Sequence, residues 1–190
     1  MVVLNMSLDG ETMNCWKTIN LSKDVGLHRI SFISMLTMIC VFILTYLPIN
    51  LFFSKVHLKD GHFLMFVLLM VSMIPIHKIL HALPLLLCGC RVEMKIKFYY
   101  MFPSFQLKAC NGIKKHNMLI SLLTPFIVFT TVFLYGSILF PAYMHYFSIA
   151  MAFHIGLCVP DFIFIKHLLL APRSCFVEEF DDGFEVLVQK

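Results

Sequence analysis

Long apolar stretches separated by short polar segments dominate the sequence. A helix needs about 20 mostly apolar residues to cross a membrane. Four stretches reach this length, at 31–53, 63–89, 118–140 and 142–171. The prolines inside them do not argue against helices, because neighbouring helices satisfy the backbone groups that proline frees. The pattern predicts an all-α membrane protein with four transmembrane helices.

Between the second and third apolar stretches the period of the pattern changes. Apolar and polar residues alternate strictly over 92–98, and a period of two is typical of a β-strand. A turn at Pro103–Ser104 would let 105–110 return as a partner strand. We therefore expect a small β-hairpin-like element in the loop 90–117. The alternative is a loosely ordered basic loop that is held near anionic lipid headgroups.

These elements divide the chain into three parts. Residues 1–30 form an N-terminal cytoplasmic segment, 31–171 form the four-helix transmembrane domain with its cytoplasmic loop, and 172–190 form a cytoplasmic tail. The tail carries a further strand-like run at 184–188, FEVLV, after an acidic turn. We expect this run and the hairpin to form a small β-element against the membrane.

The first residues carry little pattern. Residues 1–12 look like a weakly ordered lead-in, and either Met1 or Met13 could be the true start. The first apolar stretch begins near Ser31, which is too late for the apolar core of a signal peptide, and it is too long for one. We therefore expect no cleavable signal peptide.

Composition strengthens the membrane interpretation. The chain is 59% apolar and 14% charged, whereas soluble domains are about 45–50% apolar and about 25% charged. Lys and Arg concentrate before the first span, in the loop 90–117 and in the tail, which predicts that both termini and this loop are cytoplasmic. No basic run is interleaved with aromatic residues, so we expect no nucleic-acid partner. The expected location is the cell membrane, with several passes.

Ionisable residues inside the apolar stretches are the candidates for chemistry. A central Lys or Asp costs about 2.5–3.5 kcal/mol to insert, so such residues are usually functional. His77 and His81 are four residues apart and share one helix face. Asp161 lies deep in the fourth stretch, where a carboxylate needs a metal or another cation. His77, His81 and Asp161 thus form a candidate three-ligand zinc site with an open fourth position, and His154 lies two turns before Asp161.

A simpler arrangement uses no metal. Lys78 on the second span could pair with Asp161 on the fourth, and His77 and His81 could form hydrogen bonds across the helix bundle. An ion pair of this kind would also satisfy the buried carboxylate. The residues alone leave both arrangements open, so the expected cofactor is zinc or none.

Four short motifs occur in order: HKILHA at 77–82, SLLTPFIV at 121–128, HIGLCVPD at 154–161 and DDGFEVLV at 181–188. With them the chain resembles the putative membrane zincin peptidase family of small bacterial proteins, which is distantly akin to site-2 proteases. The resemblance runs from about residue 13 to residue 188. It implies a four-span fold with zinc held by two histidines of the second span and an aspartate of the fourth.

The sequence departs from that family at two positions. Members carry a glutamate after the first histidine, where it activates the attacking water and shuttles its proton; this chain has Lys78. A charged ammonium has no lone pair to accept a proton, and it repels a cation. Members also tend to have Gly before the aspartate, where this chain has Pro160. The departures lead us to expect a zincin-like scaffold without normal peptidase activity, in which Lys78 occupies the position of the general base.

Three functions follow as alternatives. In the first, the protein binds a membrane-protein or peptide partner, and the strand at 92–98 accepts an extended segment by strand addition. In the second, it is an active intramembrane zinc metallopeptidase with unusual base chemistry. In the third, it is a small non-enzymatic accessory or immunity-type membrane protein in which Lys78 and Asp161 form a structural ion pair. The lipid bilayer is an expected partner in each.

Overall fold

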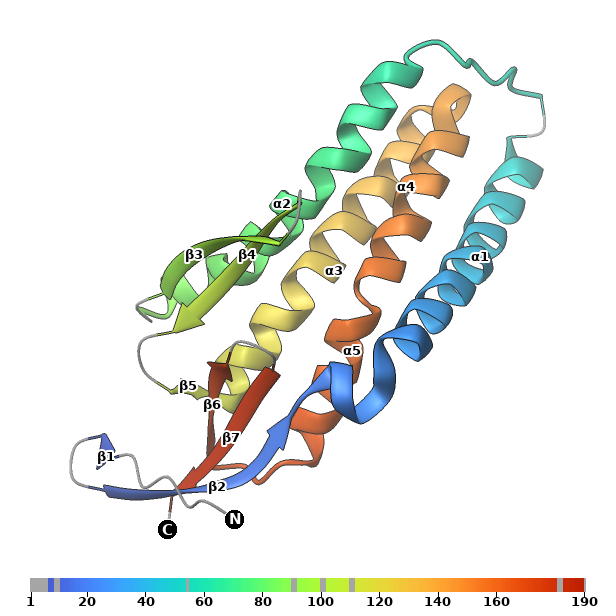
Figure 1. Ribbon diagram of the computed structural model, residues 1–190. Coiled ribbons are helices and arrows are strands. Elements are labelled where there is room, and N and C mark those ends of the chain that lie inside the picture. The colour runs from blue at the N-terminus through green and yellow to red at the C-terminus, as the bar shows by residue number, and fades with distance from the viewer. Residues whose placement is uncertain are drawn as a thin grey trace.

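The computed structural model describes residues 7–8, 11–53, 55–89, 92–99, 102–109, 112–180 and 183–189. Side chains are not described for 7–8, 11–13, 22, 92–99, 102–109, 179–180 and 189. The described part is mostly helical, with the helices at one end and a small sheet at the other (Figure 1). The helices are η1 (Ser22–Gly26), α1 (Leu27–Phe52), α2 (Phe63–Leu87), α3 (Lys115–Leu139), η2 (Pro141–Tyr143), α4 (Met144–Leu157) and α5 (Val159–Leu170). The strands are β1 (Ser7–Leu8), β2 (Glu11–Ile19), β3 (Val92–Tyr99), β4 (Phe102–Ala109), β5 (Ile113–Lys114), β6 (Cys175–Phe180) and β7 (Gly183–Gln189).

The expected apolar helices form, and three or four of them could span a membrane. Among the described residues, α1, α2 and α3 are each long and apolar enough to cross a membrane, and α4 with α5 passes the same test as one span bent by 42°. The stretch 142–171 is therefore two helices with a break. Pro160 accounts for this break, because its nitrogen cannot donate to the Gly156 carbonyl and its ring crowds that carbonyl.

The helices form a layer in which α3 and α4 lie in the middle (Figure 1). On one side α2 packs against α3, and on the other α1 packs against α4. The contact of α1 with α4 is close at Gly156, where an added Cβ would lie 3.2 Å from the Ser34 carbonyl oxygen. Small residues at such crossings are typical of membrane helices. Large apolar side chains along α1 and α2 are exposed, which suits helices that face lipid.

A sheet of order β1-β2-β7-β6-β5 closes one end of the helices. The N-terminal β2 pairs antiparallel with the C-terminal β7, from Met13 opposite Gln189 to Ile19 opposite Phe184. The predicted tail strand at 184–188 is confirmed within β7. The expectation of a weakly ordered lead-in is wrong for Ser7–Leu8 and for 11–12, which lie in strands. The sequence analysis did not predict β2, because the strand that pairs with it is at the other end of the chain.

The sheet is attached to the helices through a buried apolar cluster. It contains Ile19 of β2, Leu85 of α2, Leu122 of α3, Leu168 of α5 and Val186 of β7. The N-terminal segment, β5 and the tail therefore lie at the same end of the helices (Figure 1). That arrangement agrees with the distribution of Lys and Arg, and the cytoplasmic location of this end stays a prediction.

The predicted hairpin is present as β3 and β4, which pair antiparallel from Val92 opposite Ala109 to Tyr99 opposite Phe102. Pro103 is not in the turn, since it lies within β4 opposite Phe98; the connection falls at 100–101, outside the described residues. The hairpin contacts α2 and lies beside its second half (Figure 1). With these strands and the five-stranded sheet, the chain is mostly helical rather than all-α.

Candidate metal centre

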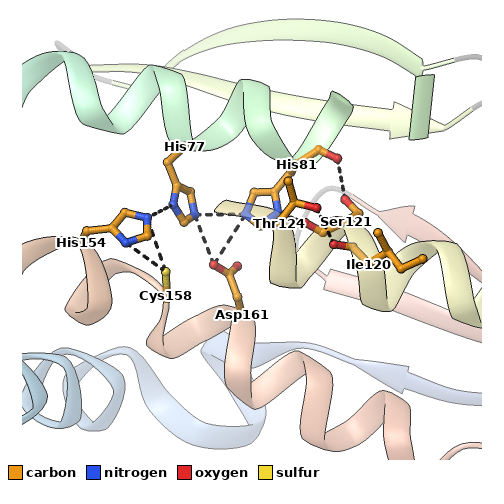
Figure 2. A network of polar contacts seen from close by, with 8 residues as sticks. All are labelled: His77, His81, Ile120, Ser121, Thr124, His154, Cys158 and Asp161. Carbon is orange, nitrogen blue, oxygen red and sulfur yellow. Dashed lines mark hydrogen bonds and ion pairs between the residues drawn. The ribbon is translucent and has the colours of Figure 1, made fainter. Parts of the chain in front are cut away.

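Three helices bring the ionisable residues together. His77 and His81 extend from α2, His154 from the last turn of α4, and Asp161 from the first turn of α5 (Figure 2). Asp161 faces α2, where its Oδ2 lies 3.2 Å from His77 Nε2. The first turn of a helix also favours a negative charge, because the helix dipole is positive there.

The cluster is shielded from solvent. His77, His81 and His154 are 6%, 7% and 0% exposed, while the Asp161 side chain is 16% exposed. Asp161 is thus the least enclosed member of the cluster. A buried carboxylate needs a cation or hydrogen-bond donors, and the two histidines supply its partners here.

The donor atoms of His77, His81 and Asp161 form a small triangle. His77 Nε2 lies 3.0 Å from His81 Nε2 and 3.2 Å from Asp161 Oδ2. His81 Nε2 lies 3.5 Å from Asp161 Oδ2. Ligands of a tetrahedral zinc ion, at about 2.0–2.1 Å from the metal, are about 3.3–3.4 Å apart. The three atoms therefore have the spacing of one face of a zinc coordination tetrahedron, and the residues fit the metal.

The ring of His81 is oriented from α3. Its Nδ1 lies 2.9 Å from the Ser121 carbonyl oxygen, and the Ser121 hydroxyl donates to the His81 carbonyl over 2.5 Å. A carbonyl can only accept, so Nδ1 carries the proton and donates it. In that tautomer Nε2 has the free lone pair, which points toward His77 and Asp161 as a metal ligand requires.

The ring of His77 is oriented from α4. Its Nδ1 lies 3.1 Å from His154 Nε2. The His154 ring lies against Phe129, with ring centroids 4.4 Å apart, and its Nδ1 lies 3.8 Å from the Cys158 sulfur. His77, His154 and Cys158 also have ligand atoms within 4.8 Å of one another. The cluster thus continues on the far side of His77.

Lys78 does not join this cluster. It is exposed, and no ion pair or hydrogen bond connects it to another described residue. Asp161 instead faces His77 and His81, so the ion pair of Lys78 with Asp161 is not formed. The helix explains the difference, because adjacent residues point about 100° apart around the axis. Among the described residues, Asp161 is therefore the carboxylate that faces the cluster.

Sequence reasoning missed Ser121 and the contact between His77 and His154. Ser121 sits in an apolar stretch with a hydroxyl that resembles other small polar groups of membrane helices. A signal was available in the spacing, since Pro125 follows four residues later and leaves the Ser121 carbonyl without its helical donor. The histidine contact depends on how α2 and α4 pack, which no local pattern encodes.

The comparisons with known proteins agree with this geometry. A family model described as putative zincin peptidase matches residues 70–176. The match covers more than half of the chain and includes His77, Lys78, His81, His154 and Asp161. No curated protein and no solved structure matches the chain. The resemblance expected over about 13–188 is thus confirmed in its central part, and the chain belongs to the putative zincin peptidase family.

Proposed function

We propose that the protein is a membrane-embedded zincin-like protein that holds zinc with His77, His81 and Asp161, lacks normal peptidase activity, and acts by binding a membrane-protein or peptide partner. The observation that carries the proposal is the pairing of a complete ligand triangle with a lysine at the position of the general base. The family membership and the apolar helices supply the scaffold.

Zinc suits the donor set. Two imidazole nitrogens and one carboxylate oxygen are a common set for a zinc ion that keeps a fourth position open. The histidines are each oriented by a second contact, as metal-ligating histidines usually are. A zinc ion bound here would act as a Lewis acid and activate a water molecule.

The proposed loss of activity rests on Lys78. A zincin needs a group that takes a proton from the attacking water, and a charged ammonium only donates. Lys78 is exposed and forms no ion pair or hydrogen bond with another described residue, so it lies outside the ligand triangle. Asp161 is occupied with both histidines, so it does not replace the missing base.

The proposed partner site is the hairpin. Within the described residues β3 and β4 form a sheet of their own, so each has an outer edge that an extended segment could extend by backbone hydrogen bonds. The hairpin contacts α2, the helix that carries both histidines. A peptide added at the edge of β3 would extend a sheet that contacts the helix carrying both histidines.

The test is the reversion of Lys78. We expect that wild-type protein in proteoliposomes does not cleave a model transmembrane peptide, and that Lys78→Glu does so in a zinc-dependent way. Lys78→Gln is the matched control, because it removes the charge without supplying a base. Adding His81→Ala to Lys78→Glu should abolish the gained cleavage. Cleavage by wild type that is lost in Lys78→Ala would instead support the active metallopeptidase and overturn the proposed loss of activity.

A further inference from the structure

The carbonyl of Ser121 has no donor in its own helix. In an α-helix the carbonyl of one residue accepts from the N–H four residues later, and for Ser121 that residue is Pro125, which has no N–H. A buried carbonyl in a membrane helix must find another donor. His81 Nδ1 supplies it across the interface of α2 and α3, at 2.9 Å.

We propose that Pro125 is a positioning residue of the metal centre. By removing the helical donor, it makes the Ser121 carbonyl available to His81 Nδ1, and this contact directs the lone pair of His81 Nε2 toward the metal. The role of Pro125 rests on the zinc site proposed above, and it concerns how one ligand of that site is oriented.

Three other hydroxyl groups on α3 form hydrogen bonds of a different kind from that of Ser121. Thr124, Thr131 and Ser137 each donate to a carbonyl of α3 itself. The Ser121 hydroxyl instead donates across the interface to the His81 carbonyl. Ser121 therefore contacts the same histidine twice, through its carbonyl to the ring and through its hydroxyl to the backbone (Figure 2).

Burial protects the contact between His81 Nδ1 and the Ser121 carbonyl from competing donors. Ser121 and His81 are buried, and Pro125 is among the most enclosed residues of the described chain. Water therefore does not compete for the carbonyl. A residue with an N–H at position 125 would compete, since it would offer the donor that a regular helix uses. Because a carbonyl oxygen has two lone pairs, it would then be shared between two donors, and its bond to His81 Nδ1 would be weaker and less well directed. The His81 proton could then move to Nε2, which cannot bind metal in that form.

The test separates orientation from folding. We expect Pro125→Ala to weaken zinc binding about 10- to 100-fold, as the loss of a partner to a ligating histidine typically does. The same change should alter the thermal stability of the metal-free protein only slightly, because the higher helix propensity of alanine offsets the buried volume that is lost. A merely structural proline would show the reverse, with lower stability and unchanged zinc affinity. The measurement is zinc competition with a chromogenic chelator on the full chain in detergent.

Two further measurements make the outcome decisive. Pro48→Ala is the matched control, because Pro48 lies inside α1 away from the cluster, and it should leave zinc affinity unchanged. Nitrogen-15 spectra of the His81 ring in the metal-free protein should show the proton on Nδ1 in wild type and a tautomer mixture in Pro125→Ala. Unchanged zinc affinity in Pro125→Ala, or a wild-type His81 protonated on Nε2, would overturn the role of Pro125.

The same data distinguish this role from the zinc site itself. If wild type bound no zinc, the proposed site would fail, while the His81 spectra would still decide whether Pro125 controls the tautomer. If wild type and Pro125→Ala bound zinc equally, the site would stand and the role of Pro125 would fail. The wild-type spectrum needs no variant, so a His81 ring protonated on Nε2 would overturn the role of Pro125 even where Pro125→Ala does not fold.

Discussion

His77 Nδ1 and His154 Nε2 lie 3.1 Å apart in a buried contact that joins α2 to the end of α4. Since His77 turns Nε2 toward Asp161, at 3.2 Å, a metal at Nε2 requires the proton on Nδ1. His154 is then the acceptor of that proton. The contact orients His77, as the Ser121 carbonyl orients His81.

Replacing His154 should therefore weaken metal binding without removing a ligand. We expect His154→Leu to lower zinc affinity about 10- to 100-fold, and His154→Gln to restore much of it, because a glutamine oxygen can accept near the position of Nε2. His145→Leu is the control, since His145 lies on the same helix but faces Asp60, with 3.6 Å between Nε2 and the carboxylate. Equal affinities in all three variants would contradict the role of His154.

The separation of Lys78 from Asp161 has a thermodynamic consequence. We expect Lys78→Met to leave the free energy of unfolding unchanged or raise it, because the lysine is exposed on an apolar helix. Its effect and that of Asp161→Asn should add within about 0.5 kcal/mol. A buried ion pair would instead make each single change cost about 3–5 kcal/mol and the double variant less than their sum. Unfolding of the metal-free variants in mixed micelles measures this coupling.

Gly156 of α4 packs closely against α1. A Cβ there would collide with the Met38 side chain of α1 and would approach the Ser34 carbonyl. We expect Gly156→Ala to lower stability by about 1–3 kcal/mol and Met38→Ala to relieve part of that loss. Thermal unfolding of the single and double variants checks this. Additive losses would mean that Gly156 is not limited by Met38.

Glu178 and Glu185 lie directly opposite each other on β6 and β7. Burial raises the pKa of Glu178, and the Glu185 charge raises it further. A pKa that is raised in the folded state means that stability is fully present below the unfolded value near 4.5 and is lost as the pH rises through the folded value. We expect Glu178→Gln to remove this loss and to stabilise the sheet at neutral pH by about 0.2–1 kcal/mol. Unfolding measured from pH 4 to pH 8 tests it, and an unchanged slope in Glu178→Gln would contradict it.

Much of the helical part could be predicted from the sequence, because spans are set by the length of apolar stretches. The stretch 31–53 became Leu27–Phe52 and 118–140 became Lys115–Leu139. The fourth span was expected as one helix, although Pro160 already marked its break. The strand Glu11–Ile19 does not alternate in polarity, and its pairing with the tail depends on contacts between the two ends of the chain.

The candidate site also has features that the sequence predicted and features that depend on how the helices pack. The spacing of His77 and His81 predicts their common face, and the cost of a buried charge singles out Asp161. Whether Lys78 or the histidines meet Asp161 depends on the rotation of α2 and on the bend before α5. The structure places the histidines there, and packing between helices decided between two arrangements that local spacing left open.

The zinc content of the purified protein tests the central claim most directly. We expect wild type, purified in detergent and dialysed against trace zinc, to retain close to one equivalent, because a three-ligand site should hold its metal. His77→Ala with His81→Ala should abolish it, and His145→Ala should not. The Lys78 charge should reduce affinity relative to Lys78→Gln without preventing binding. Less than about a tenth of an equivalent in wild type would contradict the zinc site.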